Sequence, residues 1–202
     1  MSSLLRSRYL LWAVLAVPGV LMGAAALQPD VVFEDLLHPS GEWSARLLIL
    51  ALMLTPLVQL FPQARTVRWL VRRRRAFGVA AFGYAALHLL FYVLEMGTLR
   101  DMLAELGALG IWTGWVALLL LLPLALTSND WAVRSLKSGW KRLQRLAYPA
   151  ALLTLVHWAF VHDNLTAALL NFAPLALLQA WRIARGFRPA PFHPATSLET
   201  KS

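Results

Sequence analysis

Cysteine is absent from this chain of 202 residues. Its absence excludes disulfide bonds, thiolate metal sites, iron–sulfur clusters and cysteine-based redox chemistry. Charge is also scarce: charged residues make up 14% of the chain, whereas a soluble domain usually has about 25%. No glycine-rich nucleotide-binding motif is present, which argues against a flavin or nicotinamide dinucleotide bound by a domain of this chain.

Hydrophobic residues, in contrast, make up 59% of the chain. They form six long segments, which cover Tyr9–Leu27, Leu47–Phe61, Phe77–Leu94, Leu109–Leu126, Leu146–Val161 and Leu165–Trp181. Crossing the hydrocarbon of a bilayer takes about 20 residues, so the second and fifth segments must extend into their flanks. The first segment resembles a signal peptide, but its length and the five further segments favour a retained helix. The sequence predicts an all-α membrane bundle of six transmembrane helices.

The basic residues indicate how this bundle is oriented. Seventeen of the 19 Lys and Arg residues lie before the first segment or after the second, fourth or sixth; only Arg46 and Arg100 lie on the other side. The opposite preference is shown by Asp30, Glu34, Asp35, Glu42, Glu95, Asp101, Glu105 and Asp163. The positive-inside rule then places both termini in the cytoplasm. The net charge of +9 is therefore a topology signal and a surface for anionic lipids, not a nucleic-acid-binding surface.

The rest of the chain is too short for a second domain. We expect a six-helix transmembrane domain over residues 1–185 and a disordered cytoplasmic tail over 186–202, which is rich in proline and small polar residues. On the outer side, Gln28–Ser44 predicts a short helix and a turn at the interface. Thr98–Gly107 predicts a helix on the membrane surface.

Two histidines lie deep inside apolar segments, where an ionisable side chain indicates a functional site. His88 and His157 each lie 11 residues into their segment from the cytoplasmic side. At about 1.5 Å per residue both lie roughly 17 Å above the cytoplasmic boundary, at one level of the bilayer. Two imidazoles at one level suit the axial positions of a b-type heme, and such iron favours electron transfer.

A structural role for these histidines is the alternative. A single intramembrane histidine can simply hydrogen-bond a neighbouring helix, with a gain of about 0.6–2 kcal/mol. Two at matched depth leave both interpretations open, since nearby small residues make room for a macrocycle: Gly83, Ala85, Ala86, Ala150 and Ala151. His38 in the outer segment, His162 at the outer boundary and His193 in the tail are weaker candidates.

Three stretches add a family resemblance to this interpretation. They read "LHPSGEWSARLLILALMLTPL", "RRRRAFGVAAFGYAALHLLFY" and "LALTSNDWAVRSLKSGWKRLQRLAYPAALLTLVHWAF", in that order. Over Leu37–Arg185 the chain resembles the heme-binding membrane subunits of the periplasmic methionine sulfoxide reductase system (MsrQ, formerly YedZ), in the ferric-reductase-like transmembrane group. The resemblance implies a six-helix, multi-pass protein of the bacterial inner membrane that holds heme b and passes electrons outward.

The resemblance also implies the site residues. The heme histidines of the family map onto His88 and His157, as ligands of the heme iron. A third is expected in the pattern "W-x-x-L-H-R-L-x-Y", where this chain reads "WKRLQRLAY" and has Gln144. Gln144 lies 13 residues before His157, about 20 Å nearer the cytoplasm along a straight helix. One outer heme is therefore expected, and the inner heme lacks its ligand; Gln144 either contacts a quinone or flavin headgroup or caps a helix start.

These observations lead to one function and two alternatives. The first is an electron-transfer subunit without bond chemistry of its own. It takes electrons from quinone or a cytosolic flavin reductase, with FMN as a further candidate cofactor. It passes them to a periplasmic molybdopterin-containing (MsrP-like) reductase that repairs methionine sulfoxide. The second is a stand-alone single-heme cytochrome b or ferric reductase. The third is a non-redox transporter or scaffold, which the lack of acidic residues in the expected span cores disfavours.

Overall fold

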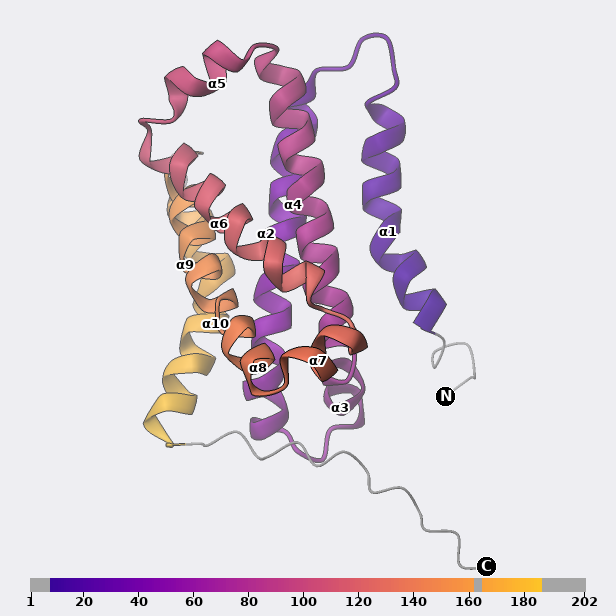
Figure 1. Cartoon of the computed structure of the whole chain (residues 1–202), viewed down its shortest axis with the longest axis vertical. Helices are drawn as coiled ribbons and strands as arrows, with labels where there is room; N and C mark the ends of the chain where they lie inside the picture. Colours follow the sequence, from indigo (N-terminus) through magenta and orange to yellow (C-terminus); the bar gives the residue numbers. More distant parts are fainter. Residues whose placement is uncertain (1–7, 162–164, 187–202) are drawn as a thin grey trace, which may run out of the picture.

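The computed structural model describes residues 8–161 and 165–186, and this part of the chain is helical and free of strands (Figure 1). Its helices are α1 (Arg8–Ala25), α2 (Phe33–Leu60), α3 (Arg65–Val71), α4 (Arg74–Met96), α5 (Leu99–Glu105), α6 (Leu109–Leu126), α7 (Asp130–Leu136), α8 (Ser138–Gln144), α9 (Ala147–Val161) and α10 (Leu165–Ala184). The all-α prediction is confirmed for these residues.

Four of the described helices are long and apolar enough to cross a membrane, namely α2, α4, α6 and α10. The apolar part of α1 and the 15-residue α9 are shorter. All six lie side by side in one bundle, with α6 crossing its neighbours at an angle (Figure 1). The chain is thus a helical membrane protein, and six crossings remain a prediction.

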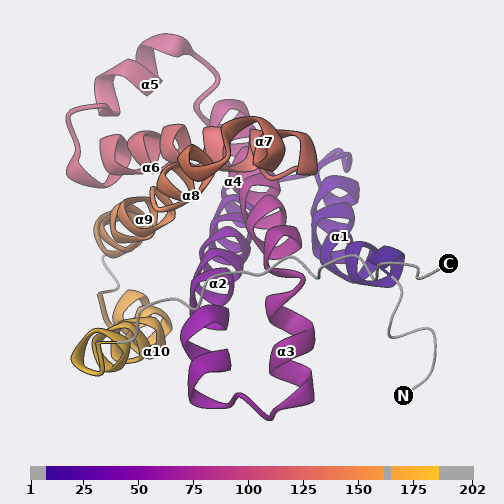
Figure 2. The same ribbon diagram turned by 60° about the horizontal axis from the view of Figure 1, so that its bottom comes forward.

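The two ends of the bundle differ in charge. The short helices α3, α7 and α8 gather at one end, together with the start of α1 and the end of α10 (Figures 1 and 2). These short helices carry basic residues such as Arg65, Arg68, Arg134, Lys141 and Arg142. Helix α5, with Asp101 in its first turn, lies at the opposite end. The segregation of charge that the sequence predicts is therefore present, and which end faces the cytoplasm remains a prediction.

The centre of the bundle is the contact between α2 and α4. Ala45 and Leu54 of α2 and Ala81 of α4 are at most 1% exposed. The two alanines allow the helix backbones to approach closely, as small residues do in membrane bundles. The hydroxyl of Ser44 donates a hydrogen bond to the carbonyl of Ala81 at 2.9 Å, which joins the two helices directly.

Helix α1 is attached to the bundle through one tyrosine of α4. The amide of Gly19 donates to the Tyr84 hydroxyl at 2.9 Å, and this hydroxyl donates to the carbonyl of Leu15 at 2.7 Å. The hydroxyl thus bridges these two backbone groups, next to Pro18, which has no amide hydrogen. A proline and an inserted side chain are recognised causes of helix bending, and α1 bends along its length in Figure 1.

The beginning of α2 differs from its prediction. Instead of a helix, a turn and a span that begins near Leu47, one continuous helix runs from Phe33 to Leu60. The sequence "HPSG" favours a turn, but here Ser40 is fully buried and its hydroxyl donates to the carbonyl of Leu37 at 2.8 Å. Neighbouring helices and serine side chains can satisfy the backbone groups that a proline frees in a membrane helix. Packing therefore overrides the local turn preference.

This correction changes the place of two charged residues. Glu42 and Arg46 lie inside α2, not in an outer loop, and form an ion pair at 2.8 Å. The expected core Leu47–Phe61 still has no acidic residue, but α2 extends beyond that core and includes Glu42.

The expected straight helix through Gln144 and His157 is also absent. Helix α8 ends at Gln144, and α9 begins at Ala147. Pro149 is the third residue of α9, in the first turn, where an amide hydrogen has no partner in the helix and proline is tolerated. The helix is therefore interrupted between the two residues, and the distance estimated along one unbroken helix does not apply. The helix predicted in Thr98–Gly107 is present as α5, and its place on the outer membrane surface remains a prediction.

Candidate heme site

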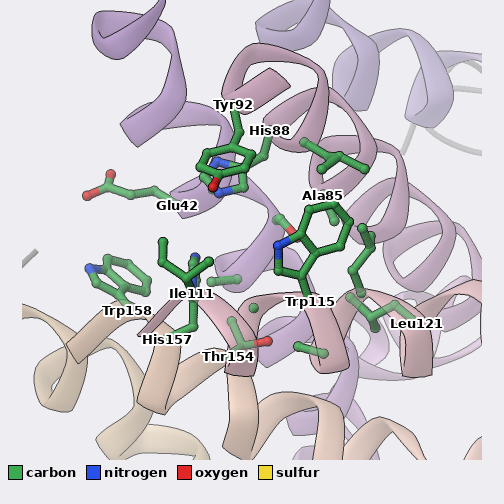
Figure 3. Close-up of a pocket in the computed structure, with 17 residues that line it drawn as sticks. Glu42, Ala85, His88, Tyr92, Ile111, Trp115, Leu121, Thr154, His157 and Trp158 are labelled. Atoms are coloured by element: carbon green, nitrogen blue, oxygen red, sulfur yellow. The ribbon is translucent and has the colours of Figure 1, made fainter. Parts of the chain in front are cut away.

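The two intramembrane histidines face each other across the bundle. His88 is carried by α4 and His157 by α9, and their ring centroids lie 5.9 Å apart with an angle of 83° between the rings (Figure 3). Two imidazole–metal bonds of about 2 Å each, together with the two half-rings, give about 6 Å between centroids. The spacing therefore fits one metal ion between the rings, and the two side chains lie at one level, as the sequence predicts.

Each imidazole is fixed by a backbone carbonyl of another helix. The Nδ1 atom of His88 lies 2.9 Å from the carbonyl oxygen of Leu37 in α2, and that of His157 lies 2.7 Å from the carbonyl oxygen of Gly110 in α6. A carbonyl only accepts hydrogen bonds, so Nδ1 must carry the proton. Nε2 then keeps its lone pair, which is the arrangement that metal-binding histidines use.

Two glycines make room for these rings. A Cβ atom on Gly41 of α2 would lie 3.0 Å from Nδ1 of His88, and one on Gly114 of α6 would lie 2.6 Å from Nδ1 of His157. Gly110, one turn before Gly114, lets α6 approach α9, because a Cβ there would lie 2.7 Å from a methyl group of Val161. The absence of a side chain at Gly41 and Gly114 gives the two rings space, and its absence at Gly110 lets α6 lie close to α9.

A cavity surrounds the pair between α2, α4, α6 and α9 (Figure 3). Besides the histidines, its polar or aromatic lining comprises Glu42, Ser44, Tyr92, Trp115, Thr154 and Trp158. The other lining residues are small or aliphatic, among them Ala45, Ala85 and Leu121. A mostly apolar cavity with a few fixed polar groups is typical of a cofactor site.

The cavity wall is connected to helix α5 through Tyr92. Its hydroxyl donates to a carboxylate oxygen of Glu105 in α5 at 3.1 Å. Its ring meets that of Trp115 edge to face, with centroids 6.4 Å apart. Because both aromatic residues line the cavity, α5 is anchored directly to the wall of the histidine site.

The remaining candidates lie elsewhere. Gln144 does not line this cavity; its amide donates to the carbonyl of Leu124 at 3.3 Å and the hydroxyl of Thr127 at 3.4 Å, at the end of α6. His38 is exposed on α2 and is also absent from the lining. His162 and His193 lie outside the described residues. Within those residues, no three His, Cys, Asp or Glu side chains gather as a metal site.

Some groups of the site were not foreseen from the sequence. Leu37 and Gly110 contribute backbone carbonyls, which every residue type has, so the sequence gives no sign of their role. The stretch "GIWTG", from Gly110 to Gly114, does carry one, since two glycines four residues apart are typical of close helix contacts in membranes. The "PSG" stretch before Glu42 indicates a turn and concealed the role of Gly41.

Comparisons with known proteins show the family to which the chain belongs. Residues 40–155 match the family model described as "Ferric reductase like transmembrane component", a range that contains His88 and ends two residues before His157. The protein-methionine-sulfoxide reductase heme-binding subunit MsrQ of Xanthomonas axonopodis pv. citri (strain 306) is 39% identical over 165 residues, which are 80% of this chain and 73% of that relative.

Two further relatives carry the same name. The MsrQ subunit of Xanthomonas campestris pv. campestris (strain 8004) is 41% identical over 165 residues, with the same shares of the two chains. That of Rhizobium meliloti (strain 1021) is 37% identical over 181 residues, 88% of this chain and 82% of the relative. No solved structure matches the chain. The chain belongs to the ferric-reductase-like transmembrane class and, within it, to the MsrQ family.

Proposed function

We propose that this chain binds one b-type heme between His88 and His157 and transfers electrons through the inner membrane to a periplasmic reductase of protein methionine sulfoxide. The observation that carries the proposal is the facing histidine pair, with each Nδ1 bound to a backbone carbonyl. The names of the relatives support it, because they are heme-binding subunits of protein-methionine-sulfoxide reductase.

The protein's part in this function is to prepare the two ligands. The carbonyls of Leu37 and Gly110 hold the rings in one tautomer, so that Nε2 of each ring is ready to bind iron without losing a proton. The apolar lining keeps water away from the rings. A heme held by His88 and His157 would supply one-electron transfer.

The charged ends suggest where electrons enter and leave. We assign the end with α3, α7 and α8 to the cytoplasm, with six crossings and both termini on that side, because basic residues concentrate there. The donor is then quinone or a cytosolic flavin reductase, with FMN as a further cofactor near Gln144. The acceptor is a periplasmic molybdopterin-containing (MsrP-like) subunit.

The acidic outer end is the docking surface in this proposal. Helix α5 carries Asp101 and Glu105, and its contact with Tyr92 brings the docking surface close to the cavity. A basic face on the partner would be attracted to it, and added salt would weaken this attraction. Transfer to the partner should therefore slow as the ionic strength rises.

A reduced-minus-oxidised spectrum of the purified chain tests the heme assignment, with heme counted per chain as the pyridine hemochrome. We expect about one b-type heme per chain, because the described residues contain one facing histidine pair. His88→Ala and His157→Ala should each abolish the spectrum. His38→Ala, a histidine on the exposed side of α2, is the matched control and should leave it unchanged.

Two outcomes contradict the proposal. Heme retained in His88→Ala would show that another residue binds the iron. A wild-type chain that is folded but has no heme, although produced in heme-replete cells, would return both histidines to a structural role. A second heme per chain would instead contradict only the heme count and point to a ligand other than Gln144.

A further inference from the structure

An arginine, Arg46, lies in the middle of the long apolar helix α2. Arg46 lies 13 residues after the first residue of α2 and 14 before the last, or about 20 Å from each end. Among the described residues of α2, α4, α6, α9 and α10, the other Lys and Arg residues lie within the first or last turn of their helix. A charged side chain at such a position is costly and indicates a functional site.

The structure holds this guanidinium at the edge of the histidine cavity. Its Nη2 atom lies 2.8 Å from a carboxylate oxygen of Glu42, a residue of the cavity lining. Its Nε atom donates to the side-chain oxygen of Asn171 in α10 at 3.3 Å, and the amide of Asn171 donates in turn to the carbonyl of Ala167. Figure 3 shows the Glu42 side chain pointing away from the two histidines, so this polar cluster lies toward the rim of the cavity.

The cluster of Arg46, Glu42 and Asn171 has hydrogen-bond donors for a further anion. A guanidinium has five N–H donors in a planar fork, and the two contacts with Glu42 and Asn171 occupy only part of them. The side chain of Arg46 is 48% exposed, so the remaining donors are accessible. None of the residues that line the cavity is a lysine or an arginine, which makes Arg46 the cation joined most directly to the lining.

We propose that Arg46 binds a carboxylate of the heme, with Glu42 and Asn171 holding its guanidinium in place. This inference rests on the proposed function, since it requires heme between His88 and His157. Heme b is an apolar plane with two carboxylates on one edge, and a carboxylate in an apolar site needs a cation. Arginine is suited to this role because its fork matches the geometry of a carboxylate.

Masking the two carboxylates of the heme itself tests the proposal most directly. The full chain is produced in heme-deficient cells, purified and titrated with protoheme or with its dimethyl ester, in which both carboxylates are masked. Wild-type protein should bind protoheme about tenfold to a hundredfold more tightly than the ester, the range for hydrogen bonds to charged groups. Arg46→Met should lose this preference and bind the ester as well as wild type does. Arg46→Lys should keep part of it.

Two further variants separate carboxylate binding from other roles of Arg46. Arg100→Met, which removes a cation from α5 at the outer end, should keep the full preference for protoheme. If Arg46 only neutralises Glu42, then the double variant Glu42→Gln/Arg46→Met should bind protoheme as wild type does. Under the proposal the double variant still binds both hemes equally.

The outcomes also separate this inference from the proposed function. If neither form of heme gives a low-spin bis-imidazole spectrum in wild-type protein, the heme site itself is wrong. If both bind with that spectrum and equal affinity, the heme site stands and the role of Arg46 is overturned. If Arg46→Met weakens protoheme and ester by the same factor, Arg46 supports only the fold of α2, which also overturns the proposal.

Discussion

The histidine site and the end of α6 at Gln144 show how similar sequence signals lead to different outcomes. The family resemblance marks both regions as heme positions, although the histidines lie in apolar sequence and Gln144 lies in the basic stretch "WKRLQRLAY". At the histidine site, carbonyls of α2 and α6 bind the two rings, and glycines give them room. At the other position, the amide of Gln144 donates hydrogen bonds to the carbonyl of Leu124 and the hydroxyl of Thr127, at the end of α6.

The groups around a polar residue in a membrane protein therefore decide its role. His88 and His157 each hydrogen-bond a backbone carbonyl through Nδ1, and both side chains line a cavity. Gln144 and its neighbour Trp140, which donates to the carbonyl of Thr127 at 2.9 Å, both satisfy backbone groups at a helix end. Helix ends leave four carbonyls without partners, so such side chains have a structural use. Four predictions test the distinction.

The largest effect is expected from Gly114→Ala. The new methyl group would lie 2.6 Å from Nδ1 and 2.8 Å from Cε1 of His157, a ring that the carbonyl of Gly110 holds in place. The ring must then move, and we expect heme content to fall to a small fraction of wild type, as measured by the pyridine hemochrome. Gly78→Ala in α4 is the control, because a Cβ there has no described atom within 4 Å. Full heme content in Gly114→Ala would show that the imidazole is not confined.

Gly41→Ala should have a smaller effect at the other ligand. Here the methyl group would lie 3.0 Å from Nδ1 and 3.1 Å from Cε1 of His88, a contact that a shift of a few tenths of an ångström can relieve. We expect heme to be retained but bound more weakly, which the rate of heme transfer to excess apomyoglobin measures. A loss greater than in Gly114→Ala would reverse the order that the two distances predict.

Gln144→Ala should affect stability and leave the heme spectrum unchanged. The substitution removes two hydrogen bonds at the end of α6, which together contribute about 1–3 kcal/mol to the free energy of unfolding. Thermal unfolding in detergent measures this loss, and the reduced-minus-oxidised spectrum measures the heme. A spectrum altered in Gln144→Ala would place this side chain at a cofactor and remove the contrast between the two regions.

The smallest effect is expected at the charged end of the bundle. The Arg75 guanidinium donates a hydrogen bond to Asp130 and, by this bond first and its charge second, lowers the pKa of that carboxyl. Because the pKa is lower in the folded state, the stabilisation is present at neutral pH and is lost as the pH falls below about 4. The pair is exposed, so the gain is small. The melting temperatures of wild type and Asp130→Asn should therefore differ slightly at pH 7 and converge in acid.

Much of the fold followed from hydrophobic length and charge. The segment Leu109–Leu126 coincides with α6, and the predicted segments over α4, α9 and α10 differ from the observed helices by at most three residues at an end. Apolar runs are reliable signals because a backbone in lipid must form its hydrogen bonds internally. The beginning of α2 was missed, since "HPSG" resembles a turn.

The sequence by itself determined that this is a helical membrane protein with two histidines at one depth, because hydrophobic length and the rise per residue of a helix fix these properties. Only the tertiary structure decided that the rings face each other at 5.9 Å, with carbonyls of Leu37 and Gly110 on their Nδ1 atoms. It also placed Glu42 and Arg46 inside α2 beside the cavity. The rotation of each helix about its axis depends on which small residues meet between helices, and this choice is made when the helices pack together.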